Sequence, residues 1–351
     1  MDRDQLDDLA AHLRAAGCVF AEDEAALLAE RAGDAAHLET LVARRVAGEP
    51  LEHVLGYVDF HGLRVAVDPG VFVPRQRTAL LVDEAVALGR QAGRPVRVPD
   101  GGTCGVAVGD PDGGTCGVAV GDPDGGAGGG TGGVTVDDPD SGAGGSAGGV
   151  AVGDPDGGRD NGLDGGPGGG PDGRTVGPAV VVVDVCCGAG ALGLATSVGL
   201  GGAETVALHA SDVDPAAVAC AARNVAAVGG TAYAGDLFDP LPPGLRGRVD
   251  LLLANVPYVP TAEIPLLPHE ARDHEAHVAL DGGGDGLDVL RRVAAEAPAW
   301  LAPGGHLLTE SGERQASGAV DVLERAGLRA RVVRDEEIGA TIVVGTLPAE
   351  T

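Results

Sequence analysis

The sequence predicts a doubly wound, mostly parallel α/β sheet, and two observations support this prediction. From residue 179 onward, short apolar segments of the strand type alternate with segments of helical periodicity. The first of these strands, 180–185, leads into the turn Gly188-Ala189-Gly190-Ala191-Leu192-Gly193, which opens a helix. Alternating strands and helices build parallel sheets, which bind ligands at the carboxyl ends of their strands. We therefore expect a ligand site at that edge.

Before this sheet the sequence predicts a helical segment, a hairpin and one further helix. Up to Glu49 the apolar residues follow helical spacing, with Leu6, Leu9 and Leu13 on one face. Alternation around His61-Gly62 predicts a β-hairpin, and a helix is expected over 78–88. The expected division is a helical domain at 1–55, a hairpin linker at 56–73, the main α/β domain at 74–97 plus 179–351, and an insertion at 98–178.

The main domain is expected to hold seven strands in chain order. The run Val249–Ala254 is almost entirely apolar, as in a buried parallel strand. The strands are expected at 180–185, 205–210, up to 234, 250–254, 305–310, 330–335 and 341–346. The helices between them are expected at 193–198, 215–228, 287–301 and 316–326.

The insertion at 98–178 is a low-complexity segment. A twelve-residue unit, Pro99–Asp110, recurs at Pro111–Asp122 and then decays into looser copies. Calcium-binding β-helix repeats also mix Gly and Asp, but they keep a nine-residue period and more apolar residues. With thirteen Asp, two Arg and few apolar residues, the segment is predicted to be a disordered acidic insertion.

Charge and cysteine usage exclude several classes of protein. The chain contains no lysine and has a formal net charge of −28, which argues against direct nucleic-acid binding. Of six cysteines, Cys104 and Cys116 occupy equivalent places in the repeat, so no disulfide framework is indicated. No charged start with an apolar signal core and no apolar run of membrane-spanning length is seen, so we expect a cytoplasmic protein without a membrane partner.

The glycine turn and the acids after later strands predict a cofactor site. The turn is a literal GxGxxG, except that Cys186 stands where a glycine is common, and Asp212 follows the next strand. NAD and S-adenosylmethionine both use such glycines and a ribose-binding acid. Asp236 and Leu237 follow the third strand and can serve an adenine amine and ring. The cofactor-binding residues are predicted to be Asp184, Cys186, Cys187, Gly188, Ala189, Gly190, Asp212, Asp236, Leu237 and Asn255.

The tetrapeptide Asn255-Val256-Pro257-Tyr258 lies directly after the strand 249–254. An Asn carbonyl and the backbone carbonyls beside a proline can accept both hydrogens of an amino group, while a tyrosine ring lies against a planar amide or base. This arrangement would present a nitrogen lone pair to an electrophile. A polar turn without a function is the alternative reading of the same four residues.

Several longer segments carry a family resemblance. They are Arg44–Leu51 with Leu55-Gly56, Phe72-Val73-Pro74-Arg75 with Thr78, Ala279–Gly283 with Asp285-Gly286-Leu287, Pro303-Gly304-Gly305, and Glu310–Gln315. In these segments and in its tetrapeptide the chain resembles the glutamine-N(5) protein methyltransferases of the HemK/PrmC type. The resemblance covers nearly all of the chain outside the insertion.

This resemblance implies a class I methyltransferase that uses S-adenosylmethionine, with a seven-stranded Rossmann-like domain. It implies transfer of a methyl group to the side-chain amide of an exposed glutamine in a protein, such as a translation release factor, which the N-terminal helical domain would recognise. The implied catalytic residues are Asn255, Pro257 and Tyr258, and these with Val256 and Arg75 would bind the substrate. Departures from the family pattern are Val256 for a first proline, Gln76-Arg77 for Pro-Glu, and Ala79 for an acid.

Three other functions are compatible with parts of the sequence. The same tetrapeptide serves methyltransferases that act on exocyclic amines of adenine or guanine in flipped-out bases. An NAD-dependent oxidoreductase would explain GxGxxG but would leave Asn255 and Asp236 without a role. An interaction protein would use only the Gly/Asp insertion. No metal is expected, although His269, His274 and His277 follow the tetrapeptide, because methyl transfer does not require one.

Overall fold

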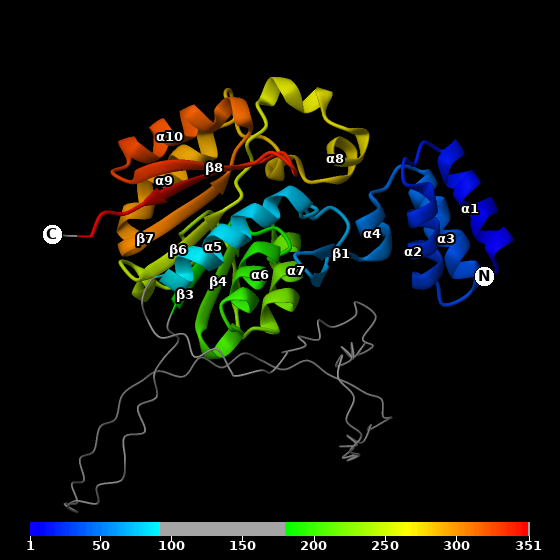
Figure 1. Ribbon diagram of the computed structural model, residues 1–351, viewed down its shortest axis with the longest axis horizontal. Helices are drawn as coiled ribbons and strands as arrows, with labels where there is room; N and C mark the ends of the chain where they lie inside the picture. The colour runs from blue at the N-terminus through cyan, green and yellow to red at the C-terminus, as the bar shows by residue number, and fades with distance from the viewer. Residues whose placement is uncertain (92–179, 350–351) are drawn as a thin grey trace, which may run out of the picture. The chain divides into compact units, whose positions relative to one another are not determined.

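The computed structural model describes residues 1–91 and 180–349. Its main sheet has seven strands in the order β5-β4-β3-β6-β7-β9-β8 (Figure 1). Neighbouring strands are parallel from β5 to β7, whereas β9 runs antiparallel to both β7 and β8. The prediction of a doubly wound, seven-stranded α/β sheet is confirmed. The strands are β3 (Val180–Val185), β4 (Val206–Asp212), β5 (Thr231–Ala234), β6 (Val249–Ala254), β7 (Leu301–Glu310), β8 (Arg329–Asp335) and β9 (Ala340–Thr346).

The central strand β3 is paired on both sides and is fully buried. It forms parallel ladders with β4 and with β6, and valine is suited to both of its faces because both are buried. Val180 and Val182 pack into the hydrophobic core on one face of the sheet. Val181 and Val183 pack into the core on the other face. The chain order reverses between β4 and β6, which both neighbour β3, and this is where such sheets bind ligands.

Helices cover both faces of the sheet. Helices α5, α6 and α7 contribute to the first core, and α9 and α10 contribute to the second (Figure 1). The described residues include no helix long and apolar enough to cross a membrane. These helices and the short α8 are α5 (Ala79–Gln91), α6 (Ala191–Gly199), α7 (Pro215–Ala226), α8 (His269–His274), α9 (Asp288–Trp300) and α10 (Ala316–Arg325). The 3₁₀ turns are 76–78, 202–204, 243–245, 261–266, 277–279 and 313–315.

Four helices before the hairpin share a separate apolar core. Leu13, Leu28 and Leu41 are buried in it. Asp2 caps the first helix and Asp34 caps the third by accepting backbone N–H bonds. These helices are α1 (Arg3–Ala15), α2 (Ala21–Arg31), α3 (Ala35–Val46) and α4 (Leu51–Leu55).

The predicted hairpin is confirmed as β1 (Tyr57–Phe60) paired antiparallel with β2 (Leu63–Ala66). Its turn places His61 and Gly62 at φ of 50° and 74°, the left-handed conformation that two-residue hairpins require. The division of the chain into domains stays a prediction. The predicted disordered insertion at 98–178 lies outside the described residues.

Candidate active site

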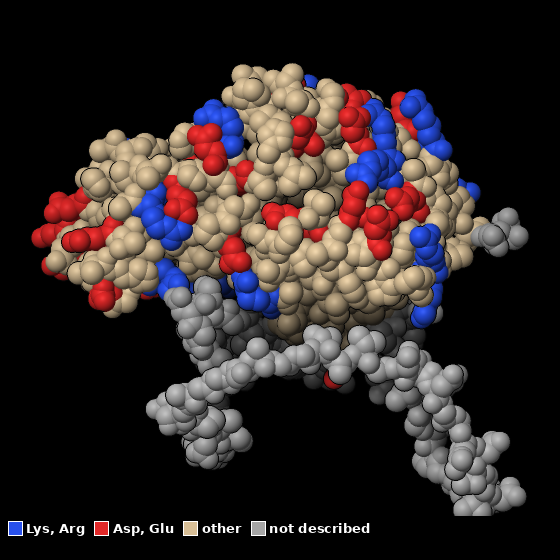
Figure 2. All heavy atoms as spheres, turned by 180° about the vertical axis from the view of Figure 1, so that it is seen from behind, with Lys and Arg blue, Asp and Glu red and all other residues tan. Residues whose placement is uncertain are grey.

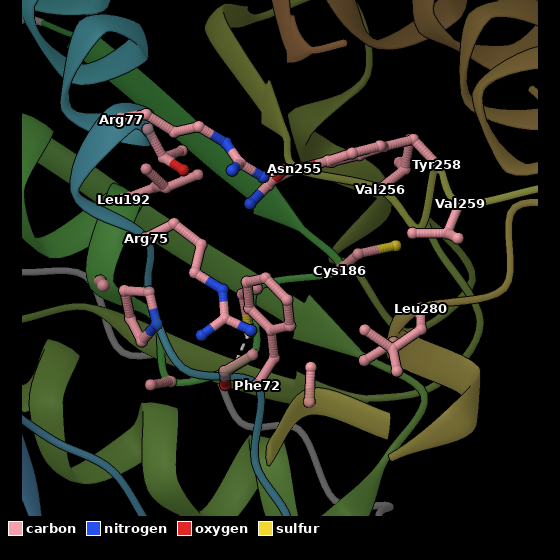
Figure 3. Close-up of a pocket in the computed structure, with 18 of the residues that line it drawn as sticks. Phe72, Arg75, Arg77, Cys186, Leu192, Asn255, Val256, Tyr258, Val259 and Leu280 are labelled. Atoms are coloured by element: carbon pink, nitrogen blue, oxygen red, sulfur yellow. Dashed lines mark hydrogen bonds between the residues drawn. The ribbon is translucent and has the colours of Figure 1, made fainter. Parts of the chain in front are cut away.

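A cavity of about 370 Å³ lies over the carboxyl ends of β3, β4 and β6 (Figure 3). One wall is the glycine turn after β3 together with Asp212. The opposite wall combines the tetrapeptide after β6 with the segment 72–78 and with part of the loop that contains α8. Six of the predicted cofactor residues and four of the predicted substrate residues line it. They are Cys186, Cys187, Gly188, Ala189, Asp212, Asn255, Val256, Tyr258 and Arg75, with Asn255 counted in both sets.

The glycine turn is held in conformations that favour glycine. Gly188 and Gly190 have φ of 54° and 74°, and Cys186 has φ of 55°. The backbone at Cys186 explains why this position commonly carries glycine, since a side chain there costs conformational energy. A Cβ on Gly188 would project across the cavity toward Phe72, 3.8 Å from its Cβ atom. Glycine therefore keeps this part of the cavity open to a ligand.

Asp212 ties the turn to the end of β4. Its Oδ2 atom accepts a hydrogen bond from the Gly188 amide at 2.9 Å, and its Oδ1 atom accepts one from the Asp214 amide at 2.9 Å. Burial raises the pKa of the Asp212 carboxyl. A carboxylate has about four acceptor positions, so both oxygens can still accept bonds from a ligand. Asp212 is thus suited to two hydroxyl groups of a ribose.

Asp184 supports the turn from beneath the cavity. It is fully buried, and its Oδ2 atom accepts a bond from the Gly193 amide at 2.9 Å. Its Oδ1 atom has no hydrogen-bond partner. Burial raises the pKa of this carboxyl to about 8 from its ordinary 3.8.

This pKa predicts how stability changes with pH. Between pH 3.8 and 8 the folded protein keeps the Asp184 proton, whereas the unfolded chain releases it. The free energy of unfolding should therefore fall as pH rises through this range, by up to about 1.4 kcal/mol per pH unit. Asp184→Asn should flatten that slope, because the amide does not titrate. Urea unfolding at pH 5 to 8 would measure both slopes, and parallel slopes would contradict the assignment.

The tetrapeptide begins where β6 ends. Asn255 and Tyr258 line the cavity, and Val256 is 2% exposed. The Oδ1 atom of Asn255 is buried and has no hydrogen-bond partner within the protein. Because an unpaired buried acceptor costs free energy, such an atom in a cavity wall is explained best by a ligand that donates to it.

A glycine-rich loop presses against the tetrapeptide backbone. An added Cβ on Gly282 would lie 2.7 Å from the Pro257 carbonyl oxygen, and one on Gly286 would lie 2.3 Å from the Tyr258 carbonyl oxygen. Gly286 also has φ of 76°. These glycines allow the close approach that sets the position of the tetrapeptide.

Replacing Gly286 should displace Tyr258. We expect Gly286→Ala to lower the turnover number at least ~10-fold, because misplacement of a catalytic segment by about an ångström is costly. Gly284 lies in the same loop with nothing within 4 Å of an added Cβ, so Gly284→Ala should keep turnover within twofold. Steady-state rates for both variants test this. Equal rates would show that the close approach has no role.

The loop around α8 carries an ion pair to the Pro-Arg segment. Arg75 donates to both carboxylate oxygens of Glu275 at 2.7 and 2.8 Å, and Glu275 also accepts from the Val73 amide.

The histidines after the tetrapeptide lie near carboxylates. His269 lies 3.4 Å from Asp273, and His277 lies 3.9 Å from Asp281. In the described parts of the chain no three His, Cys, Asp or Glu side chains are grouped to hold a metal.

Comparison with known proteins shows similarity to methyltransferases. The Methyltransferase small domain model matches residues 176–287. Release factor glutamine methyltransferase from Geobacter sulfurreducens is 28% identical over 307 residues, which cover 87% of this chain and 75% of that protein. The enzyme of the same name from Cereibacter sphaeroides is 40% identical over 179 residues, or 49% of this chain and 61% of that protein. The chain is similar to glutamine methyltransferases of the HemK/PrmC type.

The similar proteins are named for more than one substrate. Ribosomal protein uL3 glutamine methyltransferase from Bradyrhizobium diazoefficiens is 40% identical over 135 residues, which cover 37% of this chain and 40% of that protein. S-adenosylmethionine is the methyl donor of these methyltransferases. The residues present here fit it, since the open glycine turn faces the Asp212 carboxylate. The fold of this protein is the class I methyltransferase fold.

Five predicted site residues do not line the cavity. Asp184 lies beneath the glycine turn, whereas Gly190 in the turn and Pro257 in the tetrapeptide are not among the lining residues. Asp236 points outward and pairs with Arg292 at 2.6 Å, whereas Leu237 is buried in the second core at φ of 48°. The assignment of Asp236 and Leu237 to adenine stays a prediction.

Other residues of the cavity were not predicted. Phe72 and Pro74 belong to the Pro-Arg signature, in which the resemblance predicts only Arg75 as a binding residue. Arg77 departs from the family pattern and carries no predicted role. Phe60 and Glu270 also line the cavity, and nothing in their local sequence indicates it.

Proposed function

We propose that this protein transfers the methyl group of S-adenosylmethionine to the side-chain amide nitrogen of a glutamine in a partner protein. The observation that carries the proposal is the buried, unpartnered Oδ1 atom of Asn255 in the cavity wall. It lies in the same cavity as the glycine turn and Asp212, which suit the methyl donor. A donor site and a hydrogen-bond acceptor for an amino group thus share one space.

The chemistry requires alignment more than acid or base catalysis. An amide nitrogen is a poor nucleophile because its lone pair is delocalised into the carbonyl group. Asn255 and a backbone carbonyl beside Pro257 would accept hydrogen bonds from both N–H groups of the glutamine amide and so turn its lone pair toward the methyl group. The ring of Tyr258 would pack on the plane of that amide. S-adenosylmethionine supplies an electrophilic methyl group on a positively charged sulfur. The nitrogen would gain the methyl group as the methyl–sulfur bond breaks with its electron pair left on sulfur, and the nitrogen would release one proton to water.

The partner is proposed to be a translation release factor or a ribosomal protein in the cytoplasm. The curated relatives named above support both choices. Helices α1 to α4 carry their own core and are proposed to bind the protein substrate. Arg75 is proposed to line the substrate side of the cavity, where its pairing with Glu275 holds the α8 loop against it.

An exocyclic amine of a nucleic-acid base is the competing acceptor, because the tetrapeptide could hold it in the same way. The charge of −28 opposes this. Figure 2 shows one face of the molecule, on which the Arg side chains are scattered among Asp and Glu side chains without a broad basic patch.

Methyl-labelled S-adenosylmethionine, added with the protein to a cell lysate, separates the two acceptors. Half of the lysate is treated with nuclease before the protein is added. We expect label in a protein band whether or not nuclease is present. Label that disappears with nuclease treatment would overturn the proposed acceptor.

A further inference from the structure

The hydroxyl group of Tyr258 is fully engaged within the protein. Its oxygen accepts a hydrogen bond from Arg77 Nη2 at 2.6 Å and donates one to Glu310 Oε1 at 2.9 Å. Figure 3 shows Arg77 reaching from the segment 72–78 toward the strand end that carries Asn255 and Tyr258. A phenol has one proton to donate, and here that proton is directed at Glu310 and away from the cavity.

Glu310 is the centre of this network. It ends β7 and is only 4% exposed. It accepts from Arg77 Nε at 2.8 Å, from the Thr78 hydroxyl and from the Tyr258 hydroxyl. A buried carboxylate is tolerated when it is paired and hydrogen-bonded in this way. Three segments distant in sequence therefore meet at one carboxylate.

The backbone of Tyr258 is held as firmly as its side chain. Gln315 Nε2 donates to the Tyr258 carbonyl oxygen and to the Asp285 carbonyl oxygen, both at 2.9 Å. With Gly286 packed against the same carbonyl, the residue has little freedom to move. The ring direction is then decided by what holds its hydroxyl.

From these contacts we infer that Arg77 and Glu310 are positioning residues that hold the ring of Tyr258 against the acceptor amide, and that its hydroxyl takes no part in proton transfer. This inference rests on the proposed function for its acceptor. Burial raises the pKa of Tyr258 to about 12, so the phenol stays protonated at neutral pH. The side chain then acts through its ring face, and Arg77, which departs from the family's Pro-Glu, fixes the angle of that face.

Tyrosine resonances test the contact without any methyl acceptor. The chain has three tyrosines, so a sample with ¹³C-labelled tyrosine rings gives one set of ring signals from each. The set that is lost in Tyr258→Phe belongs to Tyr258. We expect Arg77→Gln to shift that signal in the full chain with adenosylhomocysteine bound. Arg64, whose guanidinium lies 4.0 Å over the ring of Tyr57, supplies the matched control. Arg64→Gln should move the Tyr57 signal and leave the Tyr258 signal in place.

Rates on a purified translation release factor test the consequence. Arg77→Gln and Tyr258→Phe should each lower kcat about tenfold through the loss of a charge-assisted hydrogen bond. Adenosylhomocysteine affinity should stay within twofold. The double variant should be far less impaired than the hundredfold product of two independent effects, because both changes break one network. Arg77→Lys keeps the charge but loses the pair of hydrogen bonds that Nε and Nη2 donate to Glu310 and Tyr258. Its rate should therefore lie between those of wild type and Arg77→Gln.

The outcomes separate the inference from the proposed function. A Tyr258 signal that is unchanged in Arg77→Gln overturns the inference, and so does a shifted signal with unchanged kcat. If Arg77→Gln does not fold, Arg77→Lys is judged by the same two criteria. If the wild-type protein labels no protein at all, the proposed function fails, and an unchanged signal still refutes the contact on its own.

Discussion

Asn255→Ala should reduce the rate of methyl transfer at least ~100-fold, which is the effect of removing one preorganised hydrogen bond from a transition state. The interaction should strengthen as the acceptor nitrogen becomes tetrahedral, so the loss should fall on kcat. Because Asn255 Oδ1 has no partner within the protein, truncating the side chain breaks no internal bond of that oxygen. Single-turnover rates, with adenosylhomocysteine affinity from calorimetry, would measure both effects.

Two further measurements test the role of Asn255 in methyl transfer. Affinity for adenosylhomocysteine should stay within a few-fold of wild type, since the methyl donor is bound by the other wall. Asn255→Asp keeps an acceptor but places a negative charge near the sulfonium, and we expect reduced transfer to a protein amide in this variant as well. Near-normal transfer by Asn255→Ala would mean that the tetrapeptide is only a turn.

Asp212→Ala should weaken adenosylhomocysteine binding by about 2–4 kcal/mol, through the loss of two hydrogen bonds to a charged group. The carboxylate would bind two ribose hydroxyls and also anchors the Gly188 amide at 2.9 Å. Its removal thus takes away a ligand contact and loosens the turn. Isothermal titration calorimetry on the wild-type and variant proteins gives the difference directly.

Asp239 offers a matched control for this measurement. It follows β5 at the same end of the sheet, is exposed, and does not line the cavity. Asp239→Ala should leave the affinity within twofold. Binding of NAD in place of adenosylhomocysteine by the wild-type protein would contradict the identity of the cofactor.

Local sequence was sufficient where local physics decides the structure. The strand 180–185 was predicted with the bounds that β3 has, because a run of valines can be buried on both faces only in a central parallel strand. Asp212 and Asn255 were expected at one edge because the carboxyl ends of parallel strands meet there. Both line the cavity. Their chemical roles stay predictions.

Side-chain direction could not be predicted in the same way. The pairing of Asp236 with Arg292 in α9 could not be read from the local sequence, and the assignment of Asp236 to adenine stays a prediction. The left-handed backbone at Leu237 could not be predicted either, since nothing in its residue type indicates a positive φ. The hydrogen-bond network of Arg77 could not be predicted either, because its partner Glu310 is 233 positions away in the sequence.

The central claim is that the acceptor is the amide nitrogen of a glutamine side chain. Hydrolysis of the labelled protein tests it most directly, because an N-methylated side-chain amide releases methylamine when the amide bond is cleaved. A release factor is incubated with methyl-labelled S-adenosylmethionine and the wild-type protein, digested, and hydrolysed. We predict volatile labelled methylamine from one glutamine-containing peptide, and none from the Asn255→Ala reaction. Label that stays on another amino acid, or that is found only in nucleic acid, would contradict the account.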